Sequence, residues 1–173
     1  MQQTVYNDEY WMKKAMEAAA KAEAVGEIPV GAVVVKDNTL IAEGWNVSIT
    51  QHDPSGHAEM MAIREAGKIF ENYRLVDCTL YVTLEPCPMC AGLLVHSRIQ
   101  RLVFGAADYK TGAAGSIMDL TRHEQLNHQM EVTGGVMEEA CSEMISAFFK
   151  RRRAEKKAAK KQLLNNGDST NCL

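Results

Sequence analysis

Two short motifs constrain this chain more than any other feature: His57-Ala58-Glu59 and Cys87-Pro88-Met89-Cys90. Each motif lies at the start of a predicted helix, and a predicted strand separates the two. Cys87 and Cys90 are three residues apart in a first helical turn, so their sulfur atoms point from the same face. If the two helices lie side by side on one face of a sheet, their N-termini converge. Such a fold would bring His57 to the two cysteines as a third metal ligand.

The rest of the chain alternates between strand and helix patterns. The run IPVGAVVV (28–35) is β-branched and nearly all apolar, as a buried strand should be. We expect helices over 8–25, 57–69, 87–96 and from about 136 onward, and strands over 28–35, 40–45, 78–84, 101–105 and 130–132. This alternation predicts an α/β fold, a three-layer α/β/α sandwich around a central mixed five-stranded sheet. We expect a single domain over 1–162, including a basic C-terminal helix, and a disordered tail over 163–173.

The composition argues against several classes of protein. The longest run without Asp, Glu, Lys or Arg covers only 12 residues, 86–97, whereas a membrane span needs roughly 18 apolar residues. The first nine residues have neither the basic nor the apolar region of a secretory signal. Five cysteines are an odd number for a disulfide framework, and 173 residues can bury a core without one. We therefore expect a cytoplasmic protein with no membrane partner.

His57, Cys87 and Cys90 form a ligand set suited to zinc. Three protein ligands and a further position for water are typical of catalytic zinc, whereas structural zinc has four protein ligands. The other residues that could supply a fourth ligand are Cys78, Cys141, Cys172, His52, His96, His123 and His128. None of these is paired with His57 at short spacing, and a redox Cys-x-x-C pair would leave His57 and Glu59 unexplained. We therefore predict a catalytic zinc.

Glu59 is the candidate catalytic residue. Because it lies two residues beyond a ligand, it can face the water position instead of the metal. Zinc lowers the pKa of its bound water to about 7, and Glu59 could take that proton and later deliver it to a leaving group. The alternative is an acidic residue that only complements the dipole at its helix N-terminus. We favour catalysis because one spacing accounts for both a ligand and a base.

The pattern His-Ala-Glu followed by Pro-Cys-x-x-Cys resembles the signature of the zinc-dependent nucleobase deaminases. From about Tyr10 to Lys161, the chain is similar to the bacterial tRNA-specific adenosine deaminases. The matching stretches are EIPVGAVVV (27–35), GWN (44–46), HDPSGHAEMMA (52–62), NYRLVDCTLYVTLEPCPMCAG (72–92), HSRI (96–99), VFGA (103–106), KTGAAGS (110–116), LNH (126–128) and FFKRRR (148–153). HAE and PCPMC are shared with cytidine and other deaminases, whereas KTGAAGS and FFKRRR indicate the tRNA enzymes.

This resemblance implies a cytidine deaminase-like fold and a homodimer with one Zn²⁺ per subunit. It implies hydrolytic conversion of adenosine to inosine at the wobble position of the tRNA anticodon, with release of ammonia. A zinc-bound hydroxide would be the nucleophile and Glu59 the proton shuttle. The partner would be the tRNA anticodon stem-loop, which would lie against the C-terminal helix.

The resemblance also implies substrate-binding roles for Asn46, Ala58, Asp108, Phe149 and Arg152. Asn46 aligns with a base-contacting Asn, and its amide suits the edge of a flipped purine. Asp108 aligns with a residue that contacts the neighbouring nucleotide, where a carboxylate could read a ribose hydroxyl; alternatively, it caps its own loop. Phe149 could stack on a splayed base, although adjacent aromatic residues in a last helix are more often part of the core.

Charge is distributed unevenly along the chain. Residues 150–161, KRRRAEKKAAKK, carry eight basic side chains and one acidic one, whereas the other 161 residues carry 11 basic and 21 acidic ones. Taken alone, such a run is more often a solvated helix face; with tRNA as the partner, it is predicted to bind phosphates.

Two other functions stay open. A superfamily enzyme acting on free cytosine nucleosides or nucleotides would not need the basic run, and a zinc-stabilised RNA-binding protein would not need Glu59.

Overall fold

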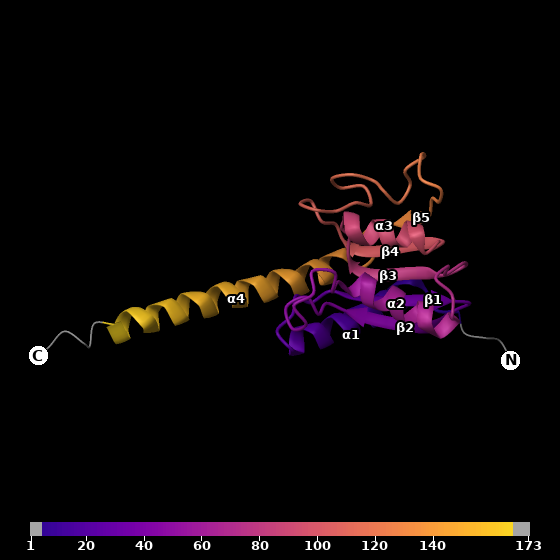
Figure 1. Cartoon of the computed structure of the whole chain (residues 1–173). Helices are drawn as coiled ribbons and strands as arrows, with labels where there is room; N and C mark the ends of the chain where they lie inside the picture. The colour runs from indigo at the N-terminus through magenta and orange to yellow at the C-terminus, as the bar shows by residue number, and fades with distance from the viewer. Residues whose placement is uncertain (1–4, 168–173) are drawn as a thin grey trace, which may run out of the picture.

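The structure, a computed structural model, describes residues 5–167. Its elements in chain order are α1 (Asp8–Ala24), β1 (Gly31–Lys36), β2 (Thr39–Trp45), α2 (Ala58–Phe70), β3 (Thr79–Leu84), α3 (Pro88–His96), β4 (Arg101–Ala106), β5 (Glu131–Thr133) and α4 (Glu138–Gly167). The strands form one sheet in the order β2-β1-β3-β4-β5 (Figure 1). β1 is antiparallel to both neighbours, whereas β3, β4 and β5 are parallel. The predicted α/β fold with a mixed five-stranded sheet is confirmed.

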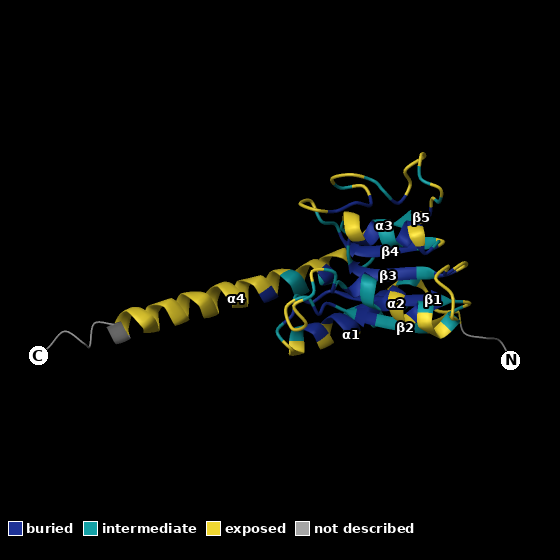
Figure 2. Cartoon of the chain, viewed as in Figure 1, coloured by how far each residue is buried: buried dark blue, intermediate teal, exposed yellow. Residues whose placement is uncertain are grey.

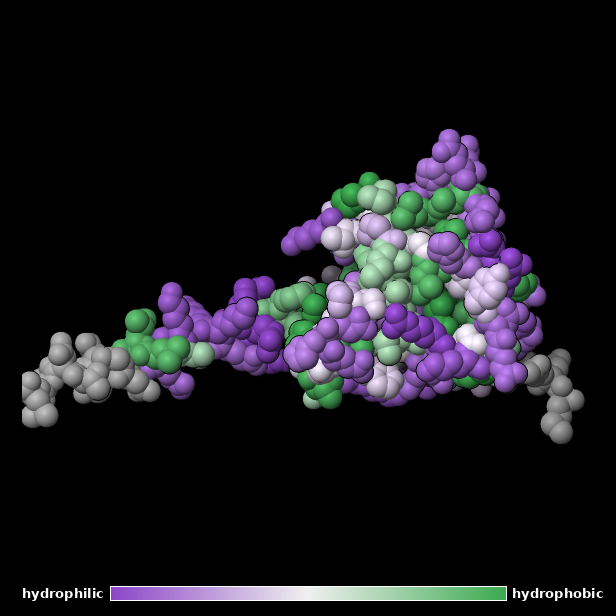
Figure 3. Space-filling view, in the orientation of Figure 1, coloured by the Kyte–Doolittle hydropathy of each residue, from purple (hydrophilic) through white to green (hydrophobic). Residues whose placement is uncertain are grey.

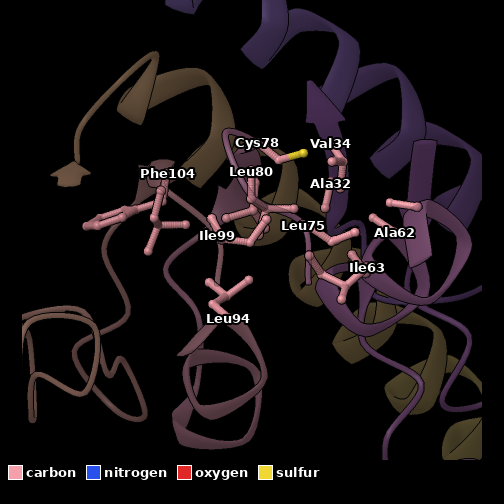
Figure 4. Packing of buried hydrophobic residues seen from close by; sticks show 14 of the residues in the cluster. Ala32, Val34, Ala62, Ile63, Leu75, Cys78, Leu80, Leu94, Ile99 and Phe104 are labelled. Carbon is pink, nitrogen blue, oxygen red and sulfur yellow. The ribbon is translucent and has the colours of Figure 1, made fainter. Parts of the chain in front are cut away.

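Helices cover both faces of this sheet because successive strand residues face opposite sides. Val33 of β1 belongs to a buried cluster with Trp11 of α1 and Cys141 of α4. The next residue, Val34, belongs to the cluster on the other face, together with Leu94 of α3 (Figure 4). The three layers are therefore α1 and the start of α4, then the sheet, then α2 and α3.

The topology brings the two motif-bearing helices together. β2 and β3 both run antiparallel to β1, so their carboxyl ends lie at the same edge of the sheet. The segments that lead into α2 and α3 start from this edge. Gly44 lets α2 lie directly on the sheet, since a Cβ there would be 2.4 Å from the Ala62 backbone nitrogen. His57 and Cys87 are the N-cap residues, so each helix begins one residue later than predicted.

The first strand begins later than the apolar pattern indicates. We expected a strand from residue 28, but β1 begins at Gly31. Pro29 has no N–H group to donate to a neighbouring strand, and the Val30 N–H donates to the Ile28 carbonyl at 2.8 Å in a local turn. Only the Val30 carbonyl continues the pairing, by accepting the Asn46 N–H at 3.2 Å, so the apolar character of 28–30 mainly reflects packing.

Helix α4 packs on the sheet only at its beginning and then projects from the body (Figure 1). Cys141 and Phe148 are buried, whereas every described side chain from Phe149 to Asn165 is exposed (Figure 2). The projecting part is mostly hydrophilic (Figure 3). Among the described residues, no helix is both long and apolar enough to cross a membrane.

The predicted tail boundary at residue 163 needs a correction, because α4 continues to Gly167. The run AEKKAAKKQLL (154–164) consists of strong helix formers, so it carries the helix onward without tertiary contacts. The rest of the predicted tail, 168–173, lies outside the described residues.

Candidate active site

The starts of α2 and α3 bring His57, Cys87 and Cys90 together. The His57 Nδ1 atom lies 3.6 Å from the Cys87 sulfur and 3.5 Å from the Cys90 sulfur. The three ligand atoms all lie within 4.8 Å of one another. Within residues 5–167, no fourth Cys, His, Asp or Glu belongs to the group. The juxtaposition expected from the two motifs is therefore present.

The group fits a zinc ion in both geometry and chemistry. Zinc bonds of about 2.3 Å to sulfur and 2.0 Å to nitrogen at a tetrahedral angle place the two ligand atoms about 3.5 Å apart, which matches both distances from His57. The hydrogen bond from Cys90 lowers the pKa of Cys87 to about 4 and raises that of Cys90, which is also buried. These opposite shifts favour a thiolate at Cys87 and a protonated thiol at Cys90. A cation would stabilise the second thiolate.

Glu59 lies in the first turn of α2, two residues after His57. It is almost fully buried, with 4% of its surface exposed. Burial raises the pKa of Glu59 to about 7, against the smaller lowering effect of its hydrogen bonds. Its carboxyl group interacts with the Cys90 thiol. A carboxyl group that can gain and lose a proton near neutral pH, next to a metal centre, is suited to general acid–base chemistry.

Asn46 and Ala58 lie together next to His57. The Ala58 N–H donates to the Asn46 side-chain oxygen at 3.0 Å. His57, the N-cap residue of α2, makes no capping bond with its own side chain. Asn46 therefore satisfies an N–H group at the helix start, and it also fixes the position from which His57 and Glu59 project.

A groove of about 510 Å³ lies between the loop after β4 and the first half of α4. Its lining residues are Ile28, Leu84, Ala106, Ala107, Asp108, Tyr109, Lys110, Thr111, Ser142, Ile145, Ser146 and Phe149. The structure thus brings together two of the predicted substrate-binding residues, Asp108 and Phe149. The metal ligands are not among the lining residues. Leu84, which lines the groove, ends β3 three residues before Cys87.

Asp108 and Phe149 take different places in this groove. The Asp108 carboxylate accepts hydrogen bonds from the backbone N–H groups of Lys110 and Thr111 and from the Thr111 hydroxyl, at 2.7–3.1 Å. Asp108 therefore caps its own loop, and its predicted contact with the neighbouring nucleotide stays a prediction. Phe149 is 41% exposed, whereas Phe148, which it meets edge to face, is 2% exposed. The aromatic pair is thus divided between the core and the groove.

Arg152 does not reach the groove. Its guanidinium lies 3.9 Å from Glu155 and stacks over the Phe148 ring. Arg151 pairs with Glu23 of α1 at 2.8 Å and also approaches Glu155. Within the described part of the chain, Arg153, Lys156, Lys157 and Lys160 make no ion pair. Within the described residues, the unpaired positive charge of this segment therefore includes Lys150 and Arg153, whereas Arg151 and Arg152 are the arginines with acidic partners.

Glu85 is the residue of this region that sequence reasoning missed. It is 2% exposed and follows β3 directly, two residues before Cys87. Its side chain accepts hydrogen bonds from Asp108, Ala114 and Ser116. A carboxyl group at the end of a buried strand was a visible signal, but its partners lie more than 20 residues away in a loop.

Comparison with known proteins places this site in a family. Residues 5–106 match the family described as the cytidine and deoxycytidylate deaminase zinc-binding region. The chain is 58% identical over 144 residues, 83% of each chain, to a tRNA-specific adenosine deaminase of Haemophilus influenzae. It is 51% identical over 143 residues to one of Bacillus subtilis, covering 83% of this chain and 89% of that one. This chain belongs to the tRNA-specific adenosine deaminase family.

A solved structure from a study of A-to-I editing by tRNA:A34 deaminases has the same fold. It is 37% identical, with a TM-score of 0.75, and covers 78% of this chain and 98% of its own. The family region is a zinc-binding one, and His57, Cys87 and Cys90 form a described group that could hold the ion. The solved relative thus confirms the predicted cytidine deaminase-like fold. The zinc-binding family region and the His/Cys/Cys group confirm the predicted cofactor.

Proposed function

We propose that this protein is a tRNA adenosine(34) deaminase, which hydrolyses adenosine to inosine at the wobble position of the anticodon and releases ammonia. The observation that carries this proposal is the buried carboxyl group of Glu59 beside His57, Cys87 and Cys90. Three ligands and an adjacent proton carrier are what a hydrolytic deaminase requires. The choice of tRNA as substrate is supported by the 58% identity to a tRNA-specific adenosine deaminase.

The reaction divides between the metal site and Glu59. Zinc held by His57, Cys87 and Cys90 would supply water with a pKa of about 7. Glu59 accepts a proton from the attacking water and passes it to the amino group of the base, which leaves as ammonia. One adenosine and one water thus give one inosine and one ammonia. Because Glu59 is buried, bulk solvent does not compete for this proton.

Asn46 has one side-chain group left for the substrate. Its amide oxygen is already engaged by the Ala58 N–H at 3.0 Å. The amide NH₂ group is therefore the part that can donate to an acceptor nitrogen of a purine. In this proposal Asn46 contacts the base directly, whereas Ala58 contributes by orienting Asn46.

The groove-facing side of α4 continues into its basic segment. Ser142, Ser146 and Phe149 line the groove, and steps of three or four residues keep side chains on one helix face. The next positions on this face are Arg153, Lys156 and Lys160, all exposed. We assign this face to the phosphates of the anticodon stem, with the loop nucleotides in the groove. Arg152, which lies 3.9 Å from Glu155 and above the Phe148 ring, contributes less to this phosphate contact than the unpaired cations.

We also propose a cytoplasmic homodimer of single-domain subunits with one zinc each. A groove of about 550 Å³ between α2 and α3 supports the homodimer, because it presents Leu93 and the 70% exposed Tyr73 above the buried Ile63. Sedimentation velocity measures the association state. A Leu93→Glu variant should sediment as a monomer; unchanged sedimentation would assign the subunit contact elsewhere.

The function is tested by offering the zinc-loaded protein an anticodon stem-loop hairpin, free adenosine and free cytidine. We expect inosine in the hairpin, no turnover of cytidine, and loss of inosine formation in Glu59→Ala. Turnover of cytidine alone would indicate a nucleoside deaminase instead. Hairpin binding without any inosine would indicate a zinc-stabilised RNA-binding protein.

A further inference from the structure

We propose that Glu85 is a positioning residue that holds the wall of the substrate groove in register with the metal centre. Residues 107–111 form this wall, and they belong to the loop 107–116, which follows β4 and includes the KTGAAGS segment. Its assignment as a substrate wall rests on the function proposed above. The placement of the loop by Glu85 follows from contacts within the protein.

The Glu85 carboxyl group is surrounded by donors from this loop. One oxygen accepts from the backbone N–H groups of Ala114 and Ser116, both at 3.0 Å. The other accepts from the Asp108 N–H at 2.9 Å and from the Ser116 hydroxyl. No cation pairs with Glu85 in the described part of the chain. Its binding capacity is therefore used entirely by the two ends of the loop.

The loop is shaped to wrap closely around this carboxyl group. A Cβ atom at Gly112 would lie 2.4 Å from both the Cδ and Oε2 atoms of Glu85. The same Cβ would lie 2.5 Å from the Asp108 carbonyl oxygen, which accepts the Gly112 N–H. The loop can therefore approach the Glu85 carboxyl group this closely only because residue 112 is a glycine.

This contact extends both into the groove and toward the metal. Glu85 holds the Asp108 backbone, and Asp108 in turn caps Lys110 and Thr111, which line the groove. In the other direction, Glu85 precedes Pro86 and Cys87. The Pro86 carbonyl accepts the Ala113 N–H at 2.8 Å. One strand end thus supports both a metal ligand and the substrate wall.

Only an acceptor suits this position. Glu85→Gln replaces one oxygen with an NH₂ group, which would face N–H or O–H donors and leave them unsatisfied. Glu85→Asp keeps both acceptors but is shorter by one methylene, so it should restore part of the function. Gly112→Ala disturbs the same contact from the loop side. Gly92→Ala in α3 is the matched control, because a Cβ there meets nothing within 4 Å.

The experiment uses the full-length zinc-loaded protein and three readouts: zinc content, amide hydrogen exchange of 107–116, and steady-state deamination of an anticodon stem-loop hairpin. For Glu85→Gln and Gly112→Ala we expect unchanged zinc. Loop exchange should be about tenfold faster or more, and KM for the hairpin should rise at least about tenfold with a smaller change in kcat. Glu85→Asp should fall between Glu85→Gln and the wild type, and Gly92→Ala should match the wild type.

The outcomes separate this inference from the proposed function. Unchanged loop exchange in Glu85→Gln, or a parallel loss of zinc, kcat and thermal stability without a change in KM, would overturn the positioning role. If the wild type deaminates no RNA, the proposed function fails. Loop exchange would then still decide whether Glu85 holds the wall in place.

Discussion

The metal centre and the exposed part of α4, residues 149–165, are built in opposite ways. Glu59 and Cys90 are buried at helix starts that pack on the sheet, and their neighbours lie at hydrogen-bond distance. Beyond Phe148, every described side chain of α4 up to residue 165 is exposed. The first region therefore depends on placement and burial, and the second on accessible charge. Changes in the first should abolish the chemistry, whereas changes in the second should alter only how well RNA binds.

The largest effect is expected for loss of the metal. Cys87→Ala removes one of three ligands, so we expect loss of bound zinc and of all deamination. Metal analysis and a hairpin deamination assay check this. Cys141→Ala, which removes a buried thiol in the opposite layer, should keep its zinc. Full activity in zinc-free Cys87→Ala would show that the centre is not catalytic.

Glu59→Ala should separate catalysis from metal binding. General acid–base catalysis contributes about 10²–10⁴-fold, so we expect kcat to fall by about that factor or more while zinc and fold are kept. Glu65→Ala, on the exposed side of the same helix, is the matched control and should retain its activity. A Glu59→Ala enzyme with normal kcat would leave the residue with no more than a dipole-complementing role.

The aromatic pair tests the boundary between the two regions. Phe148→Ala should destabilise the fold by about 3 kcal/mol, because it leaves a cavity in the core. Phe149→Ala should leave the unfolding midpoint nearly unchanged and weaken hairpin binding by about 1–3 kcal/mol if the ring stacks on a base. Thermal unfolding and hairpin affinity measure the two effects. Equal effects of both changes on stability would contradict the division.

Two charge variants on one helix test which cations reach the RNA. Lys156→Gln with Lys160→Gln removes two unpaired charges, and we expect the salt dependence of log K for tRNA to flatten by roughly one to two. Arg151→Gln with Arg152→Gln removes two charges that are already paired with Glu23 or Glu155. That variant should change affinity less. The reverse ranking would place the RNA on the other side of α4.

The smallest effect concerns an ion pair in the body. Arg101 bonds both oxygens of Asp8 at 2.8 Å, and this contact lowers the pKa of Asp8. A lowered pKa stabilises the fold above the pKa of the unfolded chain, about 4. That contribution disappears as the pH falls through the lower folded-state pKa. Wild type should therefore lose stability below about pH 4 relative to Asp8→Asn, as measured by denaturant unfolding at several pH values.

Local patterns were sufficient to predict the fold and the metal group. The strand and helix ranges follow from apolar periodicity, and the convergence of His57 with Cys87 follows from two helix starts at one edge of the sheet. What escaped prediction depends on distant contacts. Glu85 binds a loop 23–31 residues away, and Arg151 is paired with Glu23, 128 residues earlier. No local pattern contains these partners.

The exposed part of α4 shows a different limit of prediction from sequence. The sequence pattern predicts too early an end for this helix, because Asn165, Asn166 and Gly167 are weak helix formers. The preceding Ala, Lys and Leu residues nevertheless extend the helix to Gly167. Exposure of the basic face could be predicted from composition, but the pairing of Arg151 and Arg152 could not.

Inosine mapping on tRNA incubated with the purified protein, with zinc measured in the same sample, tests the central claim most directly. We predict about one zinc per chain and inosine at the wobble position of the anticodon, both retained in Glu65→Ala and only the zinc retained in Glu59→Ala. A fully zinc-loaded protein that forms no inosine in any tRNA would contradict the claim.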